Sequence, residues 1–526
     1  MIKNSCCLSL HLLRRPLPAV FMIALFGATV PAPGQLTVVE NQGDGPTIYR
    51  MVVSPAPAPE PAFRYRLFKH EDDCKDGNAV TYYYRAMLDS NRMRKAILEK
   101  FGEQYDQWYN VQEVPLDQLP KDKVHKALAL FDGTVMRSLR EATSRRRCEW
   151  DWRLDDIHDF SVFEFLLPEL QNFRAIARML LLRARLAIAE GRTRAAITSL
   201  QMIYRMGRDG AEPPLLVCGL VGLSIAGTGN TGTLELMAAP DSPNLYWALA
   251  DMPKPMIDLR RAAHYELGIG LRVLPLLREA ETAEYSPAEW SRRIGQMLKS
   301  IRTFGTASAP GSDRLPPPFD GPGWKSATSQ LAGTVLGLLT YPQAKKSLIS
   351  DGMSPREVDA MPVGQVLVLA SARAYRHTSQ QLETLWCIPF SEMKQRERAV
   401  TDHLKRKGYL GTQLFRSKEI IPIASLVLPA ISAARVAQAR LARDLAAMQL
   451  IEALRMHAAE TGQLPASLDD VKVVPVPINP ATEKPFVYHT ESSTDGRITA
   501  ILELPKSDGV RDGRRYEITL RSRKER

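Results

Sequence analysis

The sequence predicts a mainly α-helical protein, an irregular array of helical hairpins followed by a small C-terminal α+β unit. Apolar residues recur every three or four positions through the centre of the chain. One such stretch, ending at Gly462, is long enough for a single extended helix, and beyond it the apolar period changes to two. At 526 residues the chain should form two or three domains, if a domain takes about 150 residues.

The N-terminus carries the features of a secretory signal peptide. Lys3, Arg14 and Arg15 precede an apolar stretch over residues 17–30, and small residues follow just before Gln35. The apolar core is shorter than the roughly twenty residues of a spanning helix. We therefore expect cleavage after residue 34 and export to the periplasm or cell envelope. An uncleaved N-terminal anchor is the alternative.

The charge of the chain is moderately basic. The net charge is +11, of which the expected signal peptide carries three, leaving +8 on the mature chain. This surplus permits contact with anionic lipid or an acidic polymer without requiring it. A nucleic-acid binder would concentrate such charge on one face among aromatic residues, so no nucleic-acid partner is expected. The basic runs at 145–147 and 521–526 are predicted to be solvated surface.

Four cysteines remain after the expected cleavage: Cys74, Cys148, Cys218 and Cys387. None belongs to a C-x-x-C pair, so neither a zinc site nor a dense disulfide framework is indicated. One or two bridges could form after export, and the three possible full pairings stay open. Cys218 lies in an apolar run and is predicted to be a buried thiol.

Breaker clusters divide the chain. Residues 54–61 (SPAPAPEP) favour an extended spacer, and the Pro/Gly-rich stretch at 309–323 ends any helix. The predicted units are a signal peptide (1–34), a Pro-rich linker (35–62), a helical domain (63–308), a second linker (309–325), a second helical region (326–428) and the α+β unit (429–526).

The helical domain contains one clear hairpin. Apolar positions from residue 173 to 190 share one helix face, Gly191 breaks the helix, and a second amphipathic helix follows. The unit resembles a tetratricopeptide hairpin, but no second copy occurs at a period near 34 residues, so an irregular array is expected. After the second linker, helices are predicted around 328–339, 355–359 and 366–385, and the apolar segment 420–429 is predicted to be buried.

The C-terminal unit should pair a long helix with an antiparallel sheet. Between Pro429 and Thr461 an apolar stripe has Met448 near its centre, with Glu452 off the centre. Alternating apolar residues at 498–504 and 516–520 predict strands. The turn dipeptides at 495–496, 508–509 and 512–513 lie beside them.

This layout resembles the soluble domain of type II secretion pseudopilins. The resemblance is carried by the helix end at 457–462, by QLPASLDD at 463–470 and by PVPINPATEKPFVY at 475–488. It covers about the last hundred residues and implies the fold of one helix on a small sheet. A pseudopilin begins its mature chain with the apolar half of this helix, whereas here the helix starts beyond residue 400, so filament assembly is not implied.

The whole chain resembles a family of uncharacterised exported proteins of planctomycete-type bacteria. That resemblance implies an exported context and no activity. The segments that carry it are EPAFRYRL at 60–67, GNAVTYYYRA at 77–86, CEWDW at 148–152, NLYWAL at 244–249 and DAMPV at 359–363.

Two short motifs match known chemistry without its context. Residues 227–232 (GTGNTG) fit the dinucleotide fingerprint, which requires a strand before it and a helix after it. Here the surroundings are helical, so a turn between helices is predicted and no cofactor is expected. Ser391 and Lys394 fit S-x-x-K, but the partner K-T-G motif is absent.

An acidic cluster is the remaining candidate for chemistry. Carboxylates with a histidine can bind a divalent metal or act as general acid and base. On a helix, Asp151 and Asp155 would share one face. The simpler interpretation is that these acids face water beside neutralising arginines, so no catalytic or metal residue is assigned. The cluster comprises Asp151, Asp155, Asp156, His158 and Asp159, with Glu164 nearby.

The sequence thus favours a non-catalytic envelope protein whose helical surfaces bind another envelope protein. A hydrolase acting on an envelope polymer through the cluster from Asp151 to His158 is one alternative. A peripheral binder of anionic lipid or polymer is the other.

Overall fold

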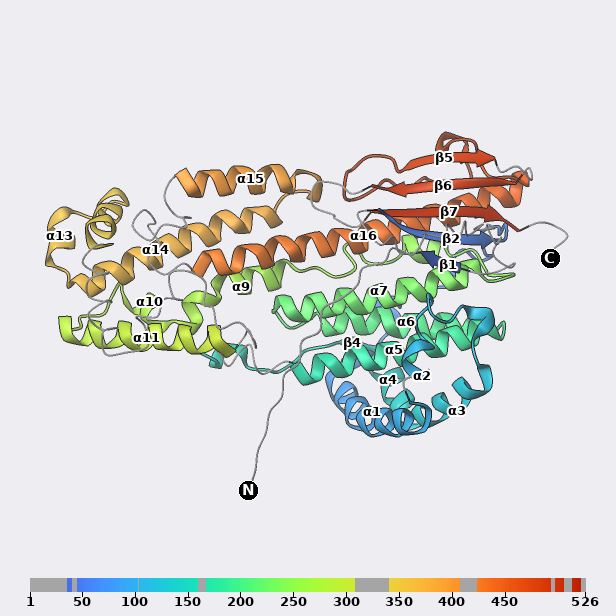
Figure 1. Ribbon diagram of the computed structural model, residues 1–526, viewed down its shortest axis with the longest axis horizontal. Helices are drawn as coiled ribbons and strands as arrows, with labels where there is room; N and C mark the ends of the chain where they lie inside the picture. The colour runs from blue at the N-terminus through green and yellow to red at the C-terminus, as the bar shows by residue number, and fades with distance from the viewer. Residues whose placement is uncertain are drawn as a thin grey trace, which may run out of the picture.

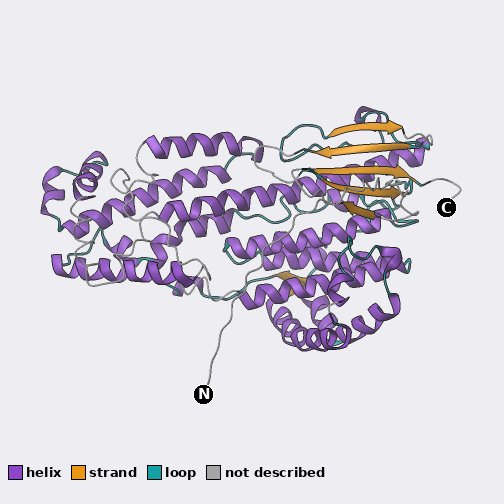
Figure 2. Ribbon diagram, viewed as in Figure 1, coloured by secondary structure: helices purple, strands orange, loops and turns teal. Residues whose placement is uncertain are grey.

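A computed structural model describes residues 36–39, 45–102, 104–158, 167–307, 340–406, 423–492, 497–505 and 513–521. The chain is mainly helical with a small mixed sheet beside its C-terminal helix, as predicted (Figure 1, Figure 2). The predicted linker at 309–325 and the predicted helix at 328–339 lie outside the described residues. So do the turn dipeptides at 495–496 and 508–509, and Asp512 of the third.

The N-terminal half forms a compact helical head. Short strands β3 and β4 pair in parallel at its start, and α1 packs against α4 and α5. The bounds of these elements are β3 Lys75–Asn78, α1 Val80–Phe101, α2 Gln104–Gln107, α3 Lys121–Phe131, α4 Thr134–Ala142, β4 Arg145–Arg147, α5 Leu167–Ala189, α6 Thr193–Gly210, α7 Leu216–Ala238 and α8 Tyr246–Ala250.

The predicted hairpin is α5 and α6, which pack along their length. Gly191 joins them at φ +69°, a left-handed conformation that favours glycine. A third helix, α7, packs on both and completes the interior of the head.

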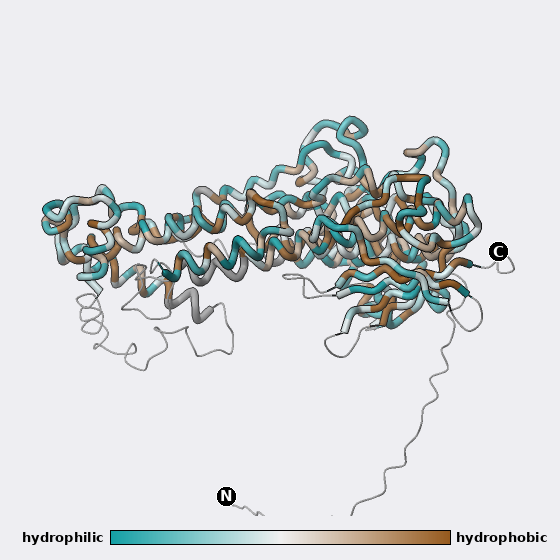
Figure 3. Tube along the Cα trace, turned by 90° about the horizontal axis from the view of Figure 1, so that it is seen from above, coloured by the Kyte–Doolittle hydropathy of each residue, from teal (hydrophilic) through white to brown (hydrophobic). Residues whose placement is uncertain are grey.

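The second half of the helical region is an elongated arm (Figure 1, Figure 3). In the arm, apolar and hydrophilic residues alternate along the helices, which is the pattern of amphipathic packing (Figure 3). Its helices are α9 Arg260–Val273, α10 Pro275–Glu279, α11 Pro287–Ala307, α13 Pro355–Ala360, α14 Val363–Glu383 and α15 Phe390–Arg406.

One helix, α16 (Ile423–Thr461), joins the arm to the head and the sheet. It packs on α9 and α14 in the arm and on α7 and α8 in the head. The boundary expected at residue 429 therefore falls inside a continuous helix, and Pro429 lies within it. The predicted end is confirmed, because Gly462 adopts φ +81° directly after the last helical residue.

The sheet has five strands in the order β1-β2-β7-β6-β5. Strands β5, β6 and β7 pair antiparallel, and β6 and β7 are the two strands that the alternation predicted. Strands β1 and β2 come from the N-terminus, and β2 pairs with β7 in parallel. The bounds are β1 Leu36–Val39, β2 Thr47–Val53, β5 Val487–Ser492, β6 Ile498–Leu504 and β7 Arg514–Leu520.

These N-terminal strands correct the prediction of a Pro-rich linker over 35–62. Met51 and Val53 are buried, and Met51 lies opposite Ile518 of β7 on the inner face of the sheet. Their burial against the helices stabilises the pairing. The proline-alternating part of the expected linker, residues 54–61, follows β2 and leads across to the head.

The outer face of the sheet is polar. Arg515 on β7 forms ion pairs with Glu491 of β5 at 3.2 Å, Glu503 of β6 at 3.5 Å and Glu517 of its own strand at 3.1 Å. Arg50 on β2 pairs with Glu517 at 2.8 Å. Cross-strand pairs of opposite charge keep this face solvated and fix the register of the strands.

The centre of α16 is buried on all sides, which corrects the expectation for Glu452. Met448 is fully buried as predicted, but Glu452 and Arg455 are fully buried too. Glu452 pairs with Arg455 at 2.8 Å. Arg455 also donates to the carbonyl oxygens of Ser54 and Ser242 at 2.9 and 2.8 Å. The polar face expected here is an internal hydrogen-bonded network.

Removing the carboxylate of this pair should strongly destabilise the protein. We expect Glu452→Ala to lower the free energy of unfolding by about 3–5 kcal/mol, because it leaves the buried Arg455 cation without its counter-ion. Glu460→Ala, at the exposed end of the same helix, should change it by less than about 0.5 kcal/mol. Urea denaturation compares the two, and equal small effects would contradict the buried network.

Candidate functional site

The acidic cluster does not form the helical face expected of it. Asp151 precedes a single 3-10 turn (Leu154–Asp156), so Asp151 and Asp155 do not share an α-helical face. Asp151 is exposed and lies 4.0 Å from Arg153, while Asp156 and His158 are also exposed. Asp159, Glu164 and the side chain of Asp155 are outside the described part. Among the described residues, no group of three His, Cys, Asp or Glu side chains could hold a metal ion.

The glycine motif at 227–232 lies inside α7, so the predicted turn is wrong. Two of its three glycines, Gly229 and Gly232, allow close contact with neighbouring helices. A Cβ on Gly229 would lie 2.9 Å from the Tyr204 ring, and the Tyr204 hydroxyl donates to Asn230 of the motif at 2.9 Å. Gly222, one turn before the motif, faces the Gly207 carbonyl, which a Cβ would meet at 2.4 Å. Gly222, Gly229 and Gly232 therefore serve helix packing.

The serine and lysine of S-x-x-K are each bonded elsewhere. Ser391 Oγ donates to Glu483 at 2.6 Å, and Lys394 Nζ donates to Glu397 at 2.7 Å. A nucleophile needs its base within hydrogen-bond reach, and these two groups are not so paired.

The cysteines are free thiols in this structure. Cys74, Cys148 and Cys218 are buried, the last as predicted, and Cys387 is exposed. Burial raises the pKa of Cys218 to about 12 and that of Cys148 above its ordinary value. Both stay protonated at neutral pH, which makes them poor nucleophiles.

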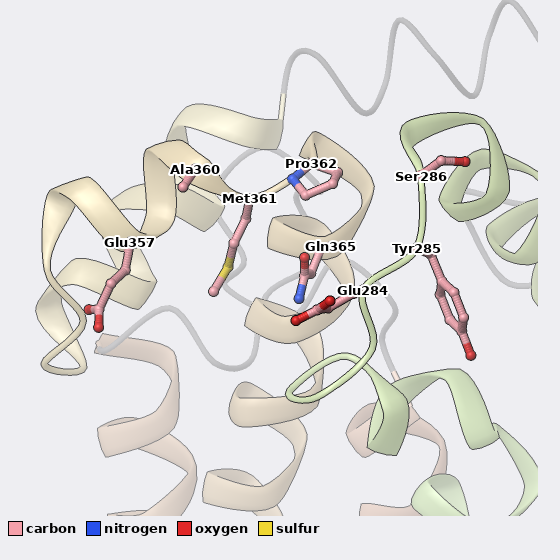
Figure 4. Close-up of a pocket in the computed structure, with 8 residues that line it drawn as sticks. All are labelled: Glu284, Tyr285, Ser286, Glu357, Ala360, Met361, Pro362 and Gln365. Atoms are coloured by element: carbon pink, nitrogen blue, oxygen red, sulfur yellow. The ribbon is translucent and has the colours of Figure 1, made fainter.

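A hollow of about 680 Å³ lies at the end of the arm (Figure 4). Two of its polar side chains already have structural partners: Glu357 accepts the Ser354 N–H in the cap of α13, and Gln365 donates to the Ala280 carbonyl at 3.1 Å. Figure 4 shows Tyr285 directed away from Met361. This arrangement offers no paired acid and base among the residues that line the hollow. They are Glu284, Tyr285, Ser286, Glu357, Ala360, Met361, Pro362 and Gln365.

An aromatic surface at the start of α1 is the strongest candidate. Asn78 bridges two distant segments, because its Oδ1 accepts the Val80 N–H at 3.2 Å and the Glu149 N–H at 3.0 Å. Together with the parallel pairing of β3 and β4, this places the chain after β4 beside the first turn of α1. Trp150 thereby packs on Tyr84, with ring centroids 5.5 Å apart.

We call Tyr84, Trp150 and Trp152 the aromatic ledge. Trp150 and Trp152 lie 5.3 Å apart between centroids, and Trp152 Nε1 donates to the Tyr84 hydroxyl at 3.1 Å. Tyr84 is 37% exposed and both tryptophans are partly exposed. Leu88, one helical turn beyond Tyr84, is 76% exposed.

The ledge is fixed from beneath by a buried polar network. Trp150 Nε1 donates to the Asp209 carbonyl at 2.9 Å, and the Tyr83 hydroxyl donates to the Asp209 carboxylate at 2.7 Å. Arg205 pairs with the same carboxylate at 2.8 Å. Phe173 packs on Trp150 with centroids 5.6 Å apart. The rings are therefore held rigidly in place.

Charges of both signs surround the ledge. Arg147 and Glu149 lie 3.9 Å apart, and Arg153 and Asp151 form the 4.0 Å pair described above. All four side chains are more than 60% exposed. The acids that suggested chemistry in the sequence are thus part of a mixed-charge rim.

A half-buried acid from the arm contacts the start of α7. Glu266 of α9 accepts the Leu216 N–H at 3.2 Å, one of the donors that the first turn of a helix leaves unpaired. Burial raises the pKa of the Glu266 carboxyl above its ordinary 4.5, although the bond from Leu216 acts in the opposite direction.

No protein-family model, curated protein or solved structure matches the chain. In the described part of the chain, no helix is both long and apolar enough to cross a bilayer.

The two kinds of glycine in α7 should respond oppositely to alanine. Gly222→Ala should destabilise the protein by about 1–3 kcal/mol, because its Cβ would meet the Gly207 carbonyl. Gly227→Ala, where a Cβ meets nothing within 4 Å, should stabilise it by up to about 1 kcal/mol. Thermal or urea unfolding measures both. A loss of stability in Gly227→Ala would show that this motif position does more than extend a helix.

Glu266→Gln should make stability less dependent on pH. Because the folded pKa is raised, the stabilisation associated with the carboxyl is complete below pH 4.5 and is lost as pH rises through the folded pKa. Glutamine keeps an acceptor for Leu216 N–H without ionising. The variant should therefore be more stable than the native protein in urea at pH 7.5 but not at pH 4.5. An equal difference at both values would contradict the raised pKa.

Proposed function

We propose that the protein is an exported envelope protein that acts, without catalysis, as a scaffold for another envelope protein. The observation that carries this proposal is the aromatic ledge, a rigid exposed ring surface with the highly exposed Leu88 beside it. Large apolar residues in this arrangement are uncommon on a surface that meets only water.

The composition of the ledge matches that of binding hot spots between proteins. Tryptophan, tyrosine and arginine dominate such hot spots, usually within a polar rim. Both indole N–H groups are already bonded, Trp150 to Asp209 and Trp152 to Tyr84. The rings therefore lose little conformational freedom on binding, which favours affinity.

Export is part of the proposal and rests on the N-terminal sequence. The first described strand begins at Leu36, just after the expected end of the signal peptide, so removal of residues 1–34 would leave the described strands intact. The pseudopilin-like and tetratricopeptide-like features are proposed as resemblances of fold. Residue 36 begins a strand of the same sheet, and that arrangement does not suggest filament assembly.

The hydrolase alternative has less support. Asp151 pairs with Arg153, and the exposed Asp156 and His158 lack the burial that tunes catalytic carboxyls. A rim of alternating charge around closely packed rings fits recognition of a protein surface better than acid–base chemistry.

Truncation of the ledge or of Leu88 beside it should weaken capture of the partner. From an envelope fraction, tagged mature protein should recover a stoichiometric protein. Leu88→Ala or Trp152→Ala should weaken the interaction by about thirtyfold, the effect of losing one hot spot. Leu220→Ala, at a 37% exposed leucine of α7, is the control and should have no effect. Circular dichroism checks that each variant is folded. Absence of a stoichiometric partner, or equal recovery by all variants, would refute the proposal.

A further inference from the structure

The surface of α1 continues from the ledge as a basic stripe. Tyr84, Leu88, Arg92 and Lys95 follow one another at helical spacing and lie on one side of α1. Arg92 and Lys95 are exposed, and neither forms an ion pair with another residue of the described part.

The charge surplus extends beyond these two residues. Asp89, which is half-buried, and Glu99 are the acids of α1. Its neighbour α4 exposes Arg137 and Arg140. At the far end of α1 a second hollow is lined by three lysines from α1 and α3, namely Lys100, Lys123 and Lys126. The cations of α1 itself are Arg85, Arg92, Arg94, Lys95 and Lys100.

We infer that the partner presents an amphipathic acidic segment, which lays apolar side chains on the ledge and Leu88 and its carboxylates on Arg92 and Lys95. This inference rests on the proposed function and names the partner's chemistry. From Tyr84 to Lys95 the stripe is about 16 Å long at 1.5 Å per residue. Three turns of a partner helix, or five residues of an extended strand, would cover it.

The mixed rim favours a protein over an anionic membrane. Glu149 and Asp151 project beside the rings, with side chains 66% and 85% exposed. Negative headgroups would repel them, whereas a folded partner can place cations opposite. The rings of the ledge also partly cover one another. Among the ledge residues and Leu88, only Leu88 projects far enough to insert into lipid.

Photocrosslinking at position 88 tests the inference in the full mature protein. Leu88 is replaced by benzoylphenylalanine, the protein is irradiated in an envelope fraction, and the captured peptides are identified by mass spectrometry. We expect peptides rich in Asp and Glu near the crosslinked residue. The yield should fall at least tenfold when Arg92→Glu and Lys95→Glu are added, and it should fall as salt is raised.

A matched control and the opposing outcomes complete the test. Reversal of two exposed charges on the arm, Lys346→Glu with Arg356→Glu, should leave the yield unchanged. Capture of neutral or basic peptides at a yield insensitive to charge reversal would overturn the acidic partner while leaving the scaffold. Retention on phosphatidylglycerol but not phosphatidylcholine vesicles, abolished by the same reversal, would overturn it in favour of a membrane. Absence of any protein adduct would overturn both proposals.

Discussion

The buried pair of Glu452 and Arg455 determines how the sheet, the head and the N-terminal segment fit together. Arg455 donates to the end of β2 at Ser54 and to the loop after α7 at Ser242. Asn244 of that loop donates to the carbonyl oxygens of Glu452 and Ala56 at 2.9 and 3.2 Å. Segments far apart in sequence thus meet on one turn of α16. A buried ion pair of this kind is tolerable only because surrounding groups satisfy its donors and acceptors.

The periodicity of apolar residues predicted the elements that expose one face to solvent and bury the other. The hairpin of α5 and α6 and strands β6 and β7 follow from it directly. Periodicity did not predict the surroundings of elements that are buried on every side. In α7 the glycines signalled a turn, although they mark close helix contacts. Glu452 looked solvated, because a sequence cannot show that the opposite side of α16 is also covered. The strand β2 was not predicted, because it lies directly before a proline-rich run that is typical of a linker.

The sequence indicated the two segments that form the aromatic ledge but not the contact between them. The segments at 77–86 and 148–152 were recognised separately as carriers of a family resemblance, and nothing in their spacing predicted that Asn78 would join them. The residues that suggested chemistry in the sequence were instead the acids that follow Trp150. Asp151 is exposed whereas Trp150 and Trp152 on either side of it are half-buried against the head, so the functional signal lay in the tryptophans. The segments at 60–67 and 244–249 also meet, through Phe63 and Trp247.

The parallel pairing of β2 with β7 constrains the order in which the parts of the protein can fold. A ribosome makes β2 near the beginning and β7 near the end, whereas most helix contacts of the head join segments close in sequence. The head can therefore become compact before synthesis reaches β7. The edge of β2 that pairs with β7 stays without its partner strand until β7 has been made. An incomplete chain would keep that edge uncovered, a ready site for aggregation or proteolysis. The sheet can therefore be completed only after β7 has been made.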